Sequence, residues 1–354
     1  MTSLTATPTT VFSVPGNRAA QEPPELRGLR RDGVRLLVGT ADAITHTTFA
    51  QIGRHLRSGD VLVVNTSATV PGQLDGTRDG IPIVVHVANR LADGSRIVEL
   101  RTAPDAAEPI LDARAGEVIE LTSGGQVELL EPYPHAGSSP NGDGNRLWRG
   151  CVRVPGKVGH YLARNARPIS YGHLQKRYPI ERYQTIFAVN PGSAEMPSAG
   201  RPFSTELVTR LTEAGIVIAP ITLHTGVSSQ EAHEAPREEW FEVGVRSAAL
   251  VNAARTAGNR VIAVGTTATR ALESAALPDG TVEARSGWTD LVISPDRPVR
   301  TVRGLVTGWH DPEASHLLLV EAVAGAELTQ RVYDAAIAGR YLWHEFGDSC
   351  LLLP

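Results

Sequence analysis

Cysteine is scarce in this chain: only Cys151 and Cys350 occur in 354 residues. Two cysteines so far apart are too few for a disulfide framework or for a set of zinc ligands. We therefore expect no bound metal, and we predict a protein of the reducing cytoplasm.

A long apolar run and an excess of positive charge are also missing. No segment is apolar over the length that a membrane span needs, and the N-terminus has no basic stretch followed by an apolar one. We expect neither export nor contact with a membrane. The formal net charge of −4 gives no global field that would attract nucleic acid, although a local basic patch is compatible with it.

The short motifs of common nucleotide and hydrolase sites are absent as well. The chain has no GxGxxG, GxxxxGK[ST], HExxH or GxSxG in a context that would support the corresponding fold. It does have 42% apolar residues, which is sufficient for one large or two moderate domains. Residues 1–27 are rich in Thr and Pro and are predicted to form a flexible tail.

Alternating strand and helix patterns occupy residues 28–71 and 156–354. In the first part, VRLLVGT and the run 61–64 are typical of buried strands, and Phe49, Ile52 and Leu56 have helical spacing. In the second part, the predicted helices are STELVTRLTEAG, SAALVNAARTAG, ATRALESAA, SHLLLVEAVAG and TQRVYDAAIAG, and the predicted strands are IVIAPITLH, RVIAVG, TDLVIS and TVRGLVTGW. This alternation indicates an α/β domain with a mainly parallel sheet flanked by helices.

A different pattern separates those two parts, over residues 72–155. Five short segments of β-forming residues, IPIVVHVANR, RIVELRT, EVIELT, QVELLEP and RLWRGCVRV, are divided by turn clusters such as ADGS and TSGG. Strands of this length and spacing predict a small antiparallel β-barrel or sandwich. We expect it to be inserted into the α/β domain as a second domain.

Polar residues follow three of the predicted parallel strands, in LHTG (223–226), VGTTATR (264–270) and VTGWH (306–310). Ligands of open α/β sheets bind beyond the carboxyl ends of the strands. We therefore expect these segments to form one polar rim.

Several residues near this rim have a candidate role and an ordinary alternative. Thr266 and Thr267 follow a glycine at the start of a helix, so they can hold a ligand or only cap that helix. Arg270 can bind a carboxylate or lie on the surface. His224 and His310 are strand-end histidines, suited to acid-base chemistry or to a structural hydrogen bond.

An aromatic residue and an amide, Tyr183 and Gln184, precede the loop NPGSAEMPSAGRPFSTEL at 190–207. They could clasp a purine, or Tyr183 and Phe187 could simply be buried. Gly and Pro residues fix the loop backbone, and its serines and N–H groups can hold ligand oxygens.

Many segments, taken in order, resemble one family, the S-adenosylmethionine:tRNA ribosyltransferase-isomerases of queuosine biosynthesis. The segments are RRDGVRLLV, LRSGDVLVVN, ERYQTIFA, GSAEMPSAGRPFSTEL, ITLHTG, VIAVGTTATRALES, GLVTGWHDP, LLLVEAVAG and FGDSCLLL. The resemblance runs from about residue 31 to the C-terminus. It implies an α/β domain with an inserted β-barrel, similar to what the periodicities predict.

The reaction implied by the resemblance uses S-adenosylmethionine as a substrate and tRNA as the acceptor. The ribosyl part moves onto the aminomethyl group of a 7-deazaguanine in the tRNA and rearranges to an epoxycyclopentane, and adenine and methionine are released. A base must remove a C5′ proton next to the sulfonium, and adenine must be protonated as it leaves.

Roles for this chain follow from the resemblance. We expect His224 or Glu206 to act as base or acid, and Arg270 to bind the methionyl carboxylate. The residues expected to hold the rest of the cofactor are Tyr183, Gln184, Ser193, Ser198, Gly200, Phe203, Thr222, Gly226, Thr266, Thr267 and His310.

The chain departs from the family pattern in places where polar residues are expected. Where the family pattern has NDTRVIPARL, this chain has NTSATVPGQL, so that Thr66, Ala68 and Gln73 replace an acid and two arginines. PSAGRPFS stands for PTAGLHFT, which puts Arg201 and Pro202 in place of a Leu-His pair. Other changes are EAPREEW for the histidine-rich HxMHSE segment, with Pro236 and Arg237 in its place and His233 adjacent, TGWHDP for TNFHLP, and EFGDS for SYGDA.

Fewer arginines weaken binding to a polyanion, and fewer histidines change proton transfer. Two alternatives to the tRNA reaction therefore stay open. One is a diverged enzyme that cleaves or rearranges S-adenosylmethionine, or a related nucleoside, with a small-molecule acceptor or none. The other is a non-catalytic S-adenosylmethionine-binding protein. The sequence leaves the oligomeric state undetermined.

Overall fold

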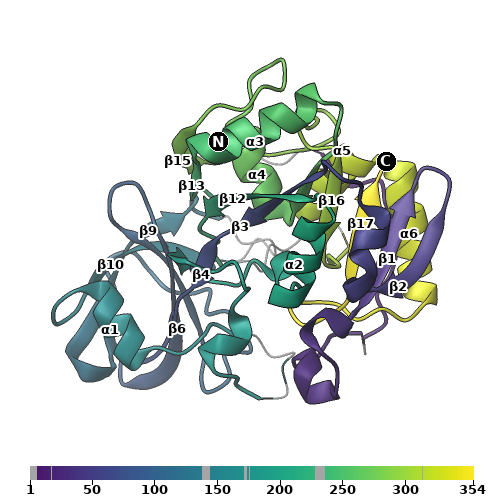
Figure 1. The fold of residues 1–354 in the computed structure, drawn as a ribbon. Coiled ribbons are helices and arrows are strands. Elements are labelled where there is room, and N and C mark those ends of the chain that lie inside the picture. Colours follow the sequence, from purple (N-terminus) through teal and green to yellow (C-terminus); the bar gives the residue numbers. More distant parts are fainter. Residues whose placement is uncertain are drawn as a thin grey trace.

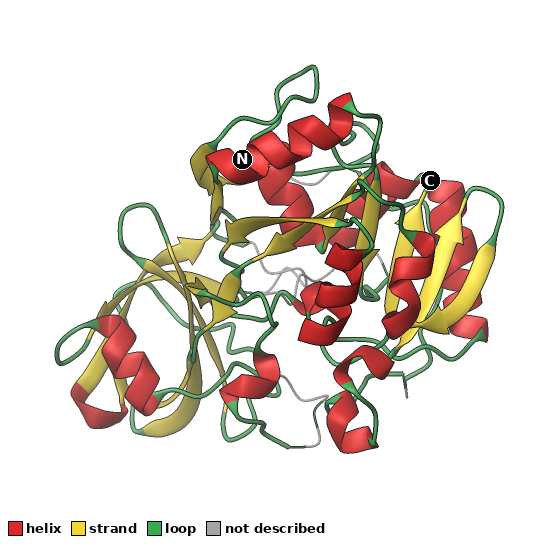
Figure 2. Ribbon diagram, in the orientation of Figure 1, coloured by secondary structure: helices red, strands yellow, loops and turns green. Residues whose placement is uncertain are grey.

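Two bodies of different architecture make up the structure, a computed structural model (Figures 1 and 2). One is a large sheet covered by helices, and the other is a β-barrel that carries one helix. The structure describes residues 6–16, 18–137, 144–170, 174, 176–227, 236–312 and 314–354. The predicted fold class, α/β with an inserted antiparallel β-barrel, is confirmed.

The large sheet has nine strands, parallel in its centre and antiparallel toward its edges. Its order is β15 (Arg285–Thr289), β13 (Glu239–Val243), β12 (Val217–Leu223), β3 (Val61–Asn65), β14 (Val261–Val264), β16 (Gly304–Thr307), β17 (Ser349–Leu353), β1 (Arg35–Thr40) and β2 (Ile44–Thr48). Neighbours from β12 to β16 are parallel, as are β17 and β1, and the other four pairs are antiparallel. The sheet is therefore mixed rather than mainly parallel.

Both faces of the central strands are buried, which explains their uninterrupted apolar runs such as VLVVN in β3. One face packs on four helices: α3 (Val245–Thr256), α4 (Thr266–Ser274), α5 (Ser315–Ala324) and α6 (Ala326–Ala338). The other face packs on α2 (Thr205–Glu213) and on the 3-10 helix η3 (Phe49–His55). Ser204 caps α2 by accepting a hydrogen bond from the N–H of Leu207 at 3.1 Å.

The barrel is closed by six strands, all antiparallel to their neighbours. Their order is β10 (Leu147–Arg153), β7 (Arg96–Thr102), β6 (Ile81–Arg90), β5 (Gln73–Arg78), β8 (Val118–Leu121) and β9 (Gly125–Tyr133). A two-stranded parallel ribbon of β4 (Ser67–Thr69) and β11 (Asn190–Ser193) lies where the chain leaves and re-enters the α/β domain.

The helix after the barrel belongs to it. Helix α1 (Val158–Asn165) contributes Tyr161 and Leu162 to the barrel core, beside Trp148 of β10. The domain boundary that the sequence predicts at residue 155 therefore leaves this helix outside the barrel, although it packs on the barrel strands. The remaining short 3-10 helices are η1 (Pro24–Arg27), η2 (Arg31–Gly33), η4 (Thr122–Gly124), η5 (Ile180–Tyr183) and η6 (Ser198–Gly200).

The N-terminal residues that the composition predicts to be flexible contact the α/β domain over much of their described length. The side chains of Thr9 and Thr10 both donate to Glu321 of α5, and Phe12 packs on Tyr333 of α6 with ring centroids 4.6 Å apart. Ala19 forms a bridge with Trp343.

Several predicted elements differ from the structure. The helix expected around Phe49 is a 3-10 helix. The strand expected in TDLVIS is replaced by a strand in the preceding segment RSGWT, which ends at Thr289. The patterns missed seven strands, β2, β4, β5, β11, β13, β15 and β17. Within the described residues, no helix is both long and apolar enough to cross a membrane.

Candidate active site

A cavity of about 330 Å³ opens at the sheet edge where β12, β14 and β16 end. The carboxyl ends of these parallel strands lie at the same edge, so the loops that follow them meet there. The lining includes residues 195–199, 225–227, 236–237, 265–267 and 307–311, with Glu239, Arg270, His316, His344 and Glu345. The predicted polar rim is confirmed.

Helix α4 begins directly at the cavity. Gly265 is its N-cap, with φ 94°, and a Cβ atom at this position would lie 3.2 Å from the Cβ of Ala199. Thr266 and Thr267 therefore do not cap the helix; they lie in its first turn and line the cavity. The N–H groups of this turn have no acceptor inside the helix, so they are available to ligand oxygens.

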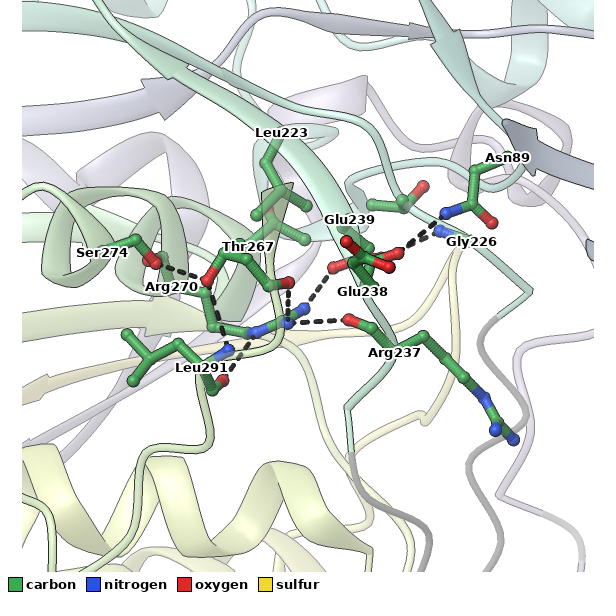
Figure 3. Close-up of polar contacts among 12 residues, drawn as sticks. Asn89, Leu223, Gly226, Arg237, Glu238, Glu239, Thr267, Arg270, Ser274 and Leu291 are labelled. Carbon is green, nitrogen blue, oxygen red and sulfur yellow. Dashed lines mark hydrogen bonds and ion pairs between the residues drawn. The ribbon is translucent and has the colours of Figure 1, made fainter. Parts of the chain in front are cut away.

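Arg270 lies in the cavity wall and holds a carboxylate of the protein itself (Figure 3). Its Nη1 pairs with Glu239 of β13, whose other oxygen accepts from the N–H of Gly226 at 2.8 Å. Its other donors bind the carbonyl oxygens of Leu291 (3.1 Å), Arg237 (2.9 Å) and Thr289 (3.1 Å). Glu239 thus occupies the place expected for the carboxylate of a ligand.

Glu239 is only 8% exposed. Burial raises the pKa of this carboxyl, and Arg270 and the N–H of Gly226 oppose that rise only in part. Removal of Arg270 would leave a buried carboxylate without its counterion. The pair therefore fixes β13 and α4 against each other at the wall of the cavity.

Three histidines line the cavity, His310, His316 and His344. The rings of His310 and His316 are stacked, with centroids 4.8 Å apart and planes 11° apart. Burial lowers the pKa of both, that of His316 to about 4, so both imidazoles are neutral at pH 7. Nε2 of His310 lies 3.0 Å from Oγ1 of Thr307, which fixes the orientation of its ring.

The charge of the described cavity wall is negative. Carboxylates come from Glu195, Glu239, Asp311 and Glu345, and guanidinium groups from Arg237 and Arg270. With His310 and His316 neutral, this excess of carboxylates favours a cationic ligand.

Of the loop residues expected to hold a ligand, only Ser198 lines the cavity. Gly200 is buried, and a Cβ atom there would lie 3.3 Å from Cγ2 of Thr185. Phe203 is 0% exposed and packs edge-on against Phe49, with ring centroids 4.9 Å apart. These two residues pack behind the loop and do not line the cavity.

Three other candidates, His224, Ser193 and Thr222, lie together on the other side of the sheet rim. Side chains alternate along a strand, so His224 follows the buried Leu223 and points away from the helices that flank Arg270. There Nδ1 of His224 lies 2.7 Å from Oγ of Ser67, and Oγ of Ser67 lies 2.6 Å from Oγ of Ser193. Oγ1 of Thr222 lies 3.0 Å from Oγ1 of Thr66. None of these side chains is among those that line the cavity.

Tyr183, Gln184 and Glu206 also lie outside the cavity lining. Tyr183 is buried against Phe346, with ring centroids 5.4 Å apart. The amide of Gln184 exchanges hydrogen bonds with the backbone of Thr69, at 3.0 Å and 2.7 Å, and so extends the ribbon. Glu206 is exposed in the first turn of α2 and does not line the cavity.

The departures from the family pattern have structural partners. Arg201 is 2% exposed, donates to Glu25 at 2.9 Å and 3.1 Å, and lies over the ring of Phe346. Gln73 is buried, and its Oε1 accepts from the N–H of Ser170 at 3.2 Å. Ala68 presents no polar group. His233 lies outside the described residues.

Sequence reasoning missed Glu239, Asp311, His316, His344 and Glu345 as cavity residues. For Glu239 a signal existed, because Glu239, Phe241 and Val243 alternate along β13, which puts a carboxylate on an otherwise apolar buried face. The histidines come from distant segments with no shared motif. Among the described residues, no group of three or more His, Cys, Asp or Glu has the arrangement of a metal site.

The comparisons with known proteins cover nearly the whole chain. The family model described as "Queuosine biosynthesis protein" matches residues 9–352. Two curated proteins named S-adenosylmethionine:tRNA ribosyltransferase-isomerase are similar: that of Desulfitobacterium hafniense is 34% identical, and that of Symbiobacterium thermophilum 35%. Each alignment covers 97% of this chain and 98% of the relative.

A solved structure is similar as well. It is the crystal structure of an S-adenosylmethionine tRNA ribosyltransferase from Thermotoga maritima, 28% identical, with a TM-score of 0.53. The match covers 97% of this chain and 99% of that one.

Proposed function

Because the chain belongs to the queuosine biosynthesis protein family, we propose that it is an enzyme, an S-adenosylmethionine:tRNA ribosyltransferase-isomerase. The proposed reaction transfers the ribosyl part of S-adenosylmethionine to a 7-deazaguanine in tRNA and rearranges it. Adenine and methionine are the products that leave.

The observation that carries this proposal is the cavity at the carboxyl edge of the sheet. Its volume of about 330 Å³ is within the range of small-molecule pockets. Its excess of carboxylates suits the sulfonium of S-adenosylmethionine, which is a fixed cation. Its neutral imidazoles, His310 and His316, can exchange hydrogen bonds with a purine without the cost of burying a second charge.

We assign the methionyl end of the cofactor by the groups that the cavity offers. The first turn of α4, with Thr266 and Thr267, supplies hydroxyl and N–H donors for the methionyl carboxylate. Arg270 acts through Glu239 and the backbone it binds, so it is a positioning residue in this proposal. Ser198 of η6 and Gly226, which follows the carboxyl end of β12, also line the cavity.

A second candidate is an enzyme that cleaves S-adenosylmethionine without tRNA. The positions at which the family pattern has arginines, 68 and 73, offer alanine and a buried glutamine here. Neither side chain can contact a phosphate as a cation, which favours an acceptor smaller than tRNA.

One incubation separates these candidates. The purified protein is mixed with S-adenosylmethionine, with and without tRNA that carries the 7-aminomethyl-7-deazaguanine base, and adenine and methionine are measured by chromatography. Release that depends on the tRNA supports the transferase, and release without it supports the second candidate. Binding in calorimetry with no release in either mixture would contradict both and leave a binding protein.

A further inference from the structure

A continuous chain of hydroxyl groups ends on His224, outside the cavity. Oγ of Ser193 is 2.6 Å from Oγ of Ser67, which is 2.7 Å from Nδ1 of His224. Ser67 and Ser193 are both 0% exposed. The N–H of Thr225 donates to Oγ of Ser193 at 3.0 Å, so the far end of the chain is fixed by a backbone donor.

The direction of these hydrogen bonds follows from a count of donors and acceptors. A hydroxyl has one proton to donate, and a buried hydroxyl needs an acceptor for it. Ser193 already accepts from Thr225, and its one acceptor among the described residues is Ser67. Ser67 therefore accepts from Ser193, and its own proton goes to Nδ1 of His224.

Two neighbours also pack on the imidazole. A Cβ atom at Gly192 would lie 2.5 to 2.6 Å from Cε1, Nδ1 and Nε2 of His224. Three nearly equal distances place that position over the ring, so the backbone of Gly192 covers one face. The ring of Trp240 stacks against His224 with centroids 5.2 Å apart and planes 22° apart.

We propose that Ser67 and Ser193 are positioning residues that hold the neutral His224 imidazole with its proton on Nε2. Nδ1 is occupied as an acceptor, and Nε2 makes no hydrogen bond to any residue that the structure describes. Burial without a charged partner keeps the ring in its neutral form.

This assignment changes what His224 can do at the start of a reaction. Nε2–H can donate a hydrogen bond or a proton, and neither nitrogen has a free lone pair with which to remove a proton from C5′. His224 is then a donor toward the acceptor substrate, and the base is another group. This catalytic consequence rests on the proposed function, whereas the tautomer itself does not.

Nitrogen NMR of protein labelled with ¹⁵N-histidine tests the tautomer, with His224→Gln used to assign the signals. We expect wild-type His224 to have a protonated Nε2 and an unprotonated Nδ1. Ser67→Ala should give a mixture of tautomers, because Nδ1 loses its donor. Ser67→Thr should restore the wild-type state, since it keeps the hydroxyl at a position where the family pattern has threonine.

Adenine release tests the consequence. We expect Ser67→Ala to lower kcat at least tenfold with KM within twofold of wild type, and Ser67→Thr to recover most of the loss. Thr329→Val is the matched control, because it removes a buried hydroxyl whose one hydrogen-bond partner among the described residues is the carbonyl of Gly325, the N-cap of α6. It should change neither value by more than twofold.

Each result decides a separate point. A wild-type His224 protonated on Nδ1, or a tautomer that Ser67→Ala leaves unchanged, overturns the proposal. The expected tautomers with an unchanged kcat overturn the positioning role. The expected tautomers in a protein that releases no adenine with any acceptor leave the hydrogen-bond assignment standing and remove the proposed function.

Discussion

Two buried carboxylates, one on each body of the molecule, have pKa values shifted in opposite directions. Glu99 of β7 lies on the outer face of the barrel, since its neighbours Val98 and Leu100 point into the barrel core. It is 0% exposed and contacts Nδ1 of His86 at 3.1 Å, Nη1 of Arg101 at 2.6 Å and Nη1 of Arg146 at 3.1 Å. Burial raises its pKa, but these partners outweigh burial and hold the pKa at about 2.

Glu239 of β13 is almost as buried but has one guanidinium, Arg270, and one backbone N–H. Here burial prevails and the pKa is raised. The difference lies in the number of partners, because each opposite charge offsets part of the desolvation cost. Two guanidinium groups contact the Glu99 carboxylate and more than balance its charge, which suits a structural role. Glu239 has one guanidinium partner, which offsets only part of its desolvation cost, and it lines a cavity.

The largest effect is expected from Glu99→Gln. The amide would leave Arg101 and Arg146 without their anion in a buried site, so the free energy of unfolding should fall by about 3–5 kcal/mol. Urea unfolding followed by circular dichroism measures the change. Glu120→Gln on the exposed side of β8 is the control, with an expected change below about 0.5 kcal/mol. A loss under about 1 kcal/mol for Glu99→Gln would remove the contrast between the two sites.

Glu239→Gln should cost less stability, about 1–3 kcal/mol, because Arg270 keeps its three backbone acceptors and burial already disfavours the charge that is removed. Its larger effect should be on the ligand: we expect at least tenfold weaker binding of S-adenosylmethionine in calorimetry. Glu242→Gln is the matched control, since Glu242 is exposed on the same strand. Equal affinities in the two variants would show that Glu239 has no part in the site.

Acid should weaken the two bodies in different pH ranges. The pKa of His316 is lowered to about 4, so its contribution is complete above pH 6.5 and is lost as the pH falls toward 4. Between pH 6.5 and pH 5 this amounts to roughly 2 kcal/mol. Glu99, with a pKa of about 2, contributes above pH 4.5 and loses that contribution between 4.5 and 2.

Urea midpoints at pH 7, 5.5 and 4.5 measure the upper range. His316→Gln should flatten the change between pH 7 and 5.5, and Glu99→Gln should leave its slope as in the wild type. A change flattened by Glu99→Gln and left as in the wild type by His316→Gln would contradict this prediction.

The smallest effect is expected from Asp112→Asn. Asp112 pairs with Arg78 at 2.6 Å, but its side chain is 80% exposed and Arg78 also pairs with Glu117. An exposed ion pair is worth about 0.2–1 kcal/mol and is screened by salt. The difference from wild type in urea should vanish at 1 M NaCl, and a difference that persists in salt would indicate a contact other than charge.

Most of the fold was predictable, because apolar periodicity sets which face of each element is buried. The five strand segments between residues 81 and 153 and the five long helices of the second half were found in this way. Strand β15 was missed because RSGWT is mostly polar and pairs at the sheet edge. Strand β13 follows residues rich in charge and carries Glu239 on its buried face, which disguises its apolar alternation.

The sequence by itself determined the two bodies, the sheet edge at which polar loops gather, and the family, because all three depend on local patterns and on motifs in order. Only the tertiary structure decided which of the candidate residues share a site. His224 and Thr225 are neighbours in sequence, yet they point to opposite faces of the sheet. Arg270 was expected to meet a ligand, and the fold gives it Glu239 instead, because the two side chains, 31 positions apart in the sequence, lie on elements that pack against each other.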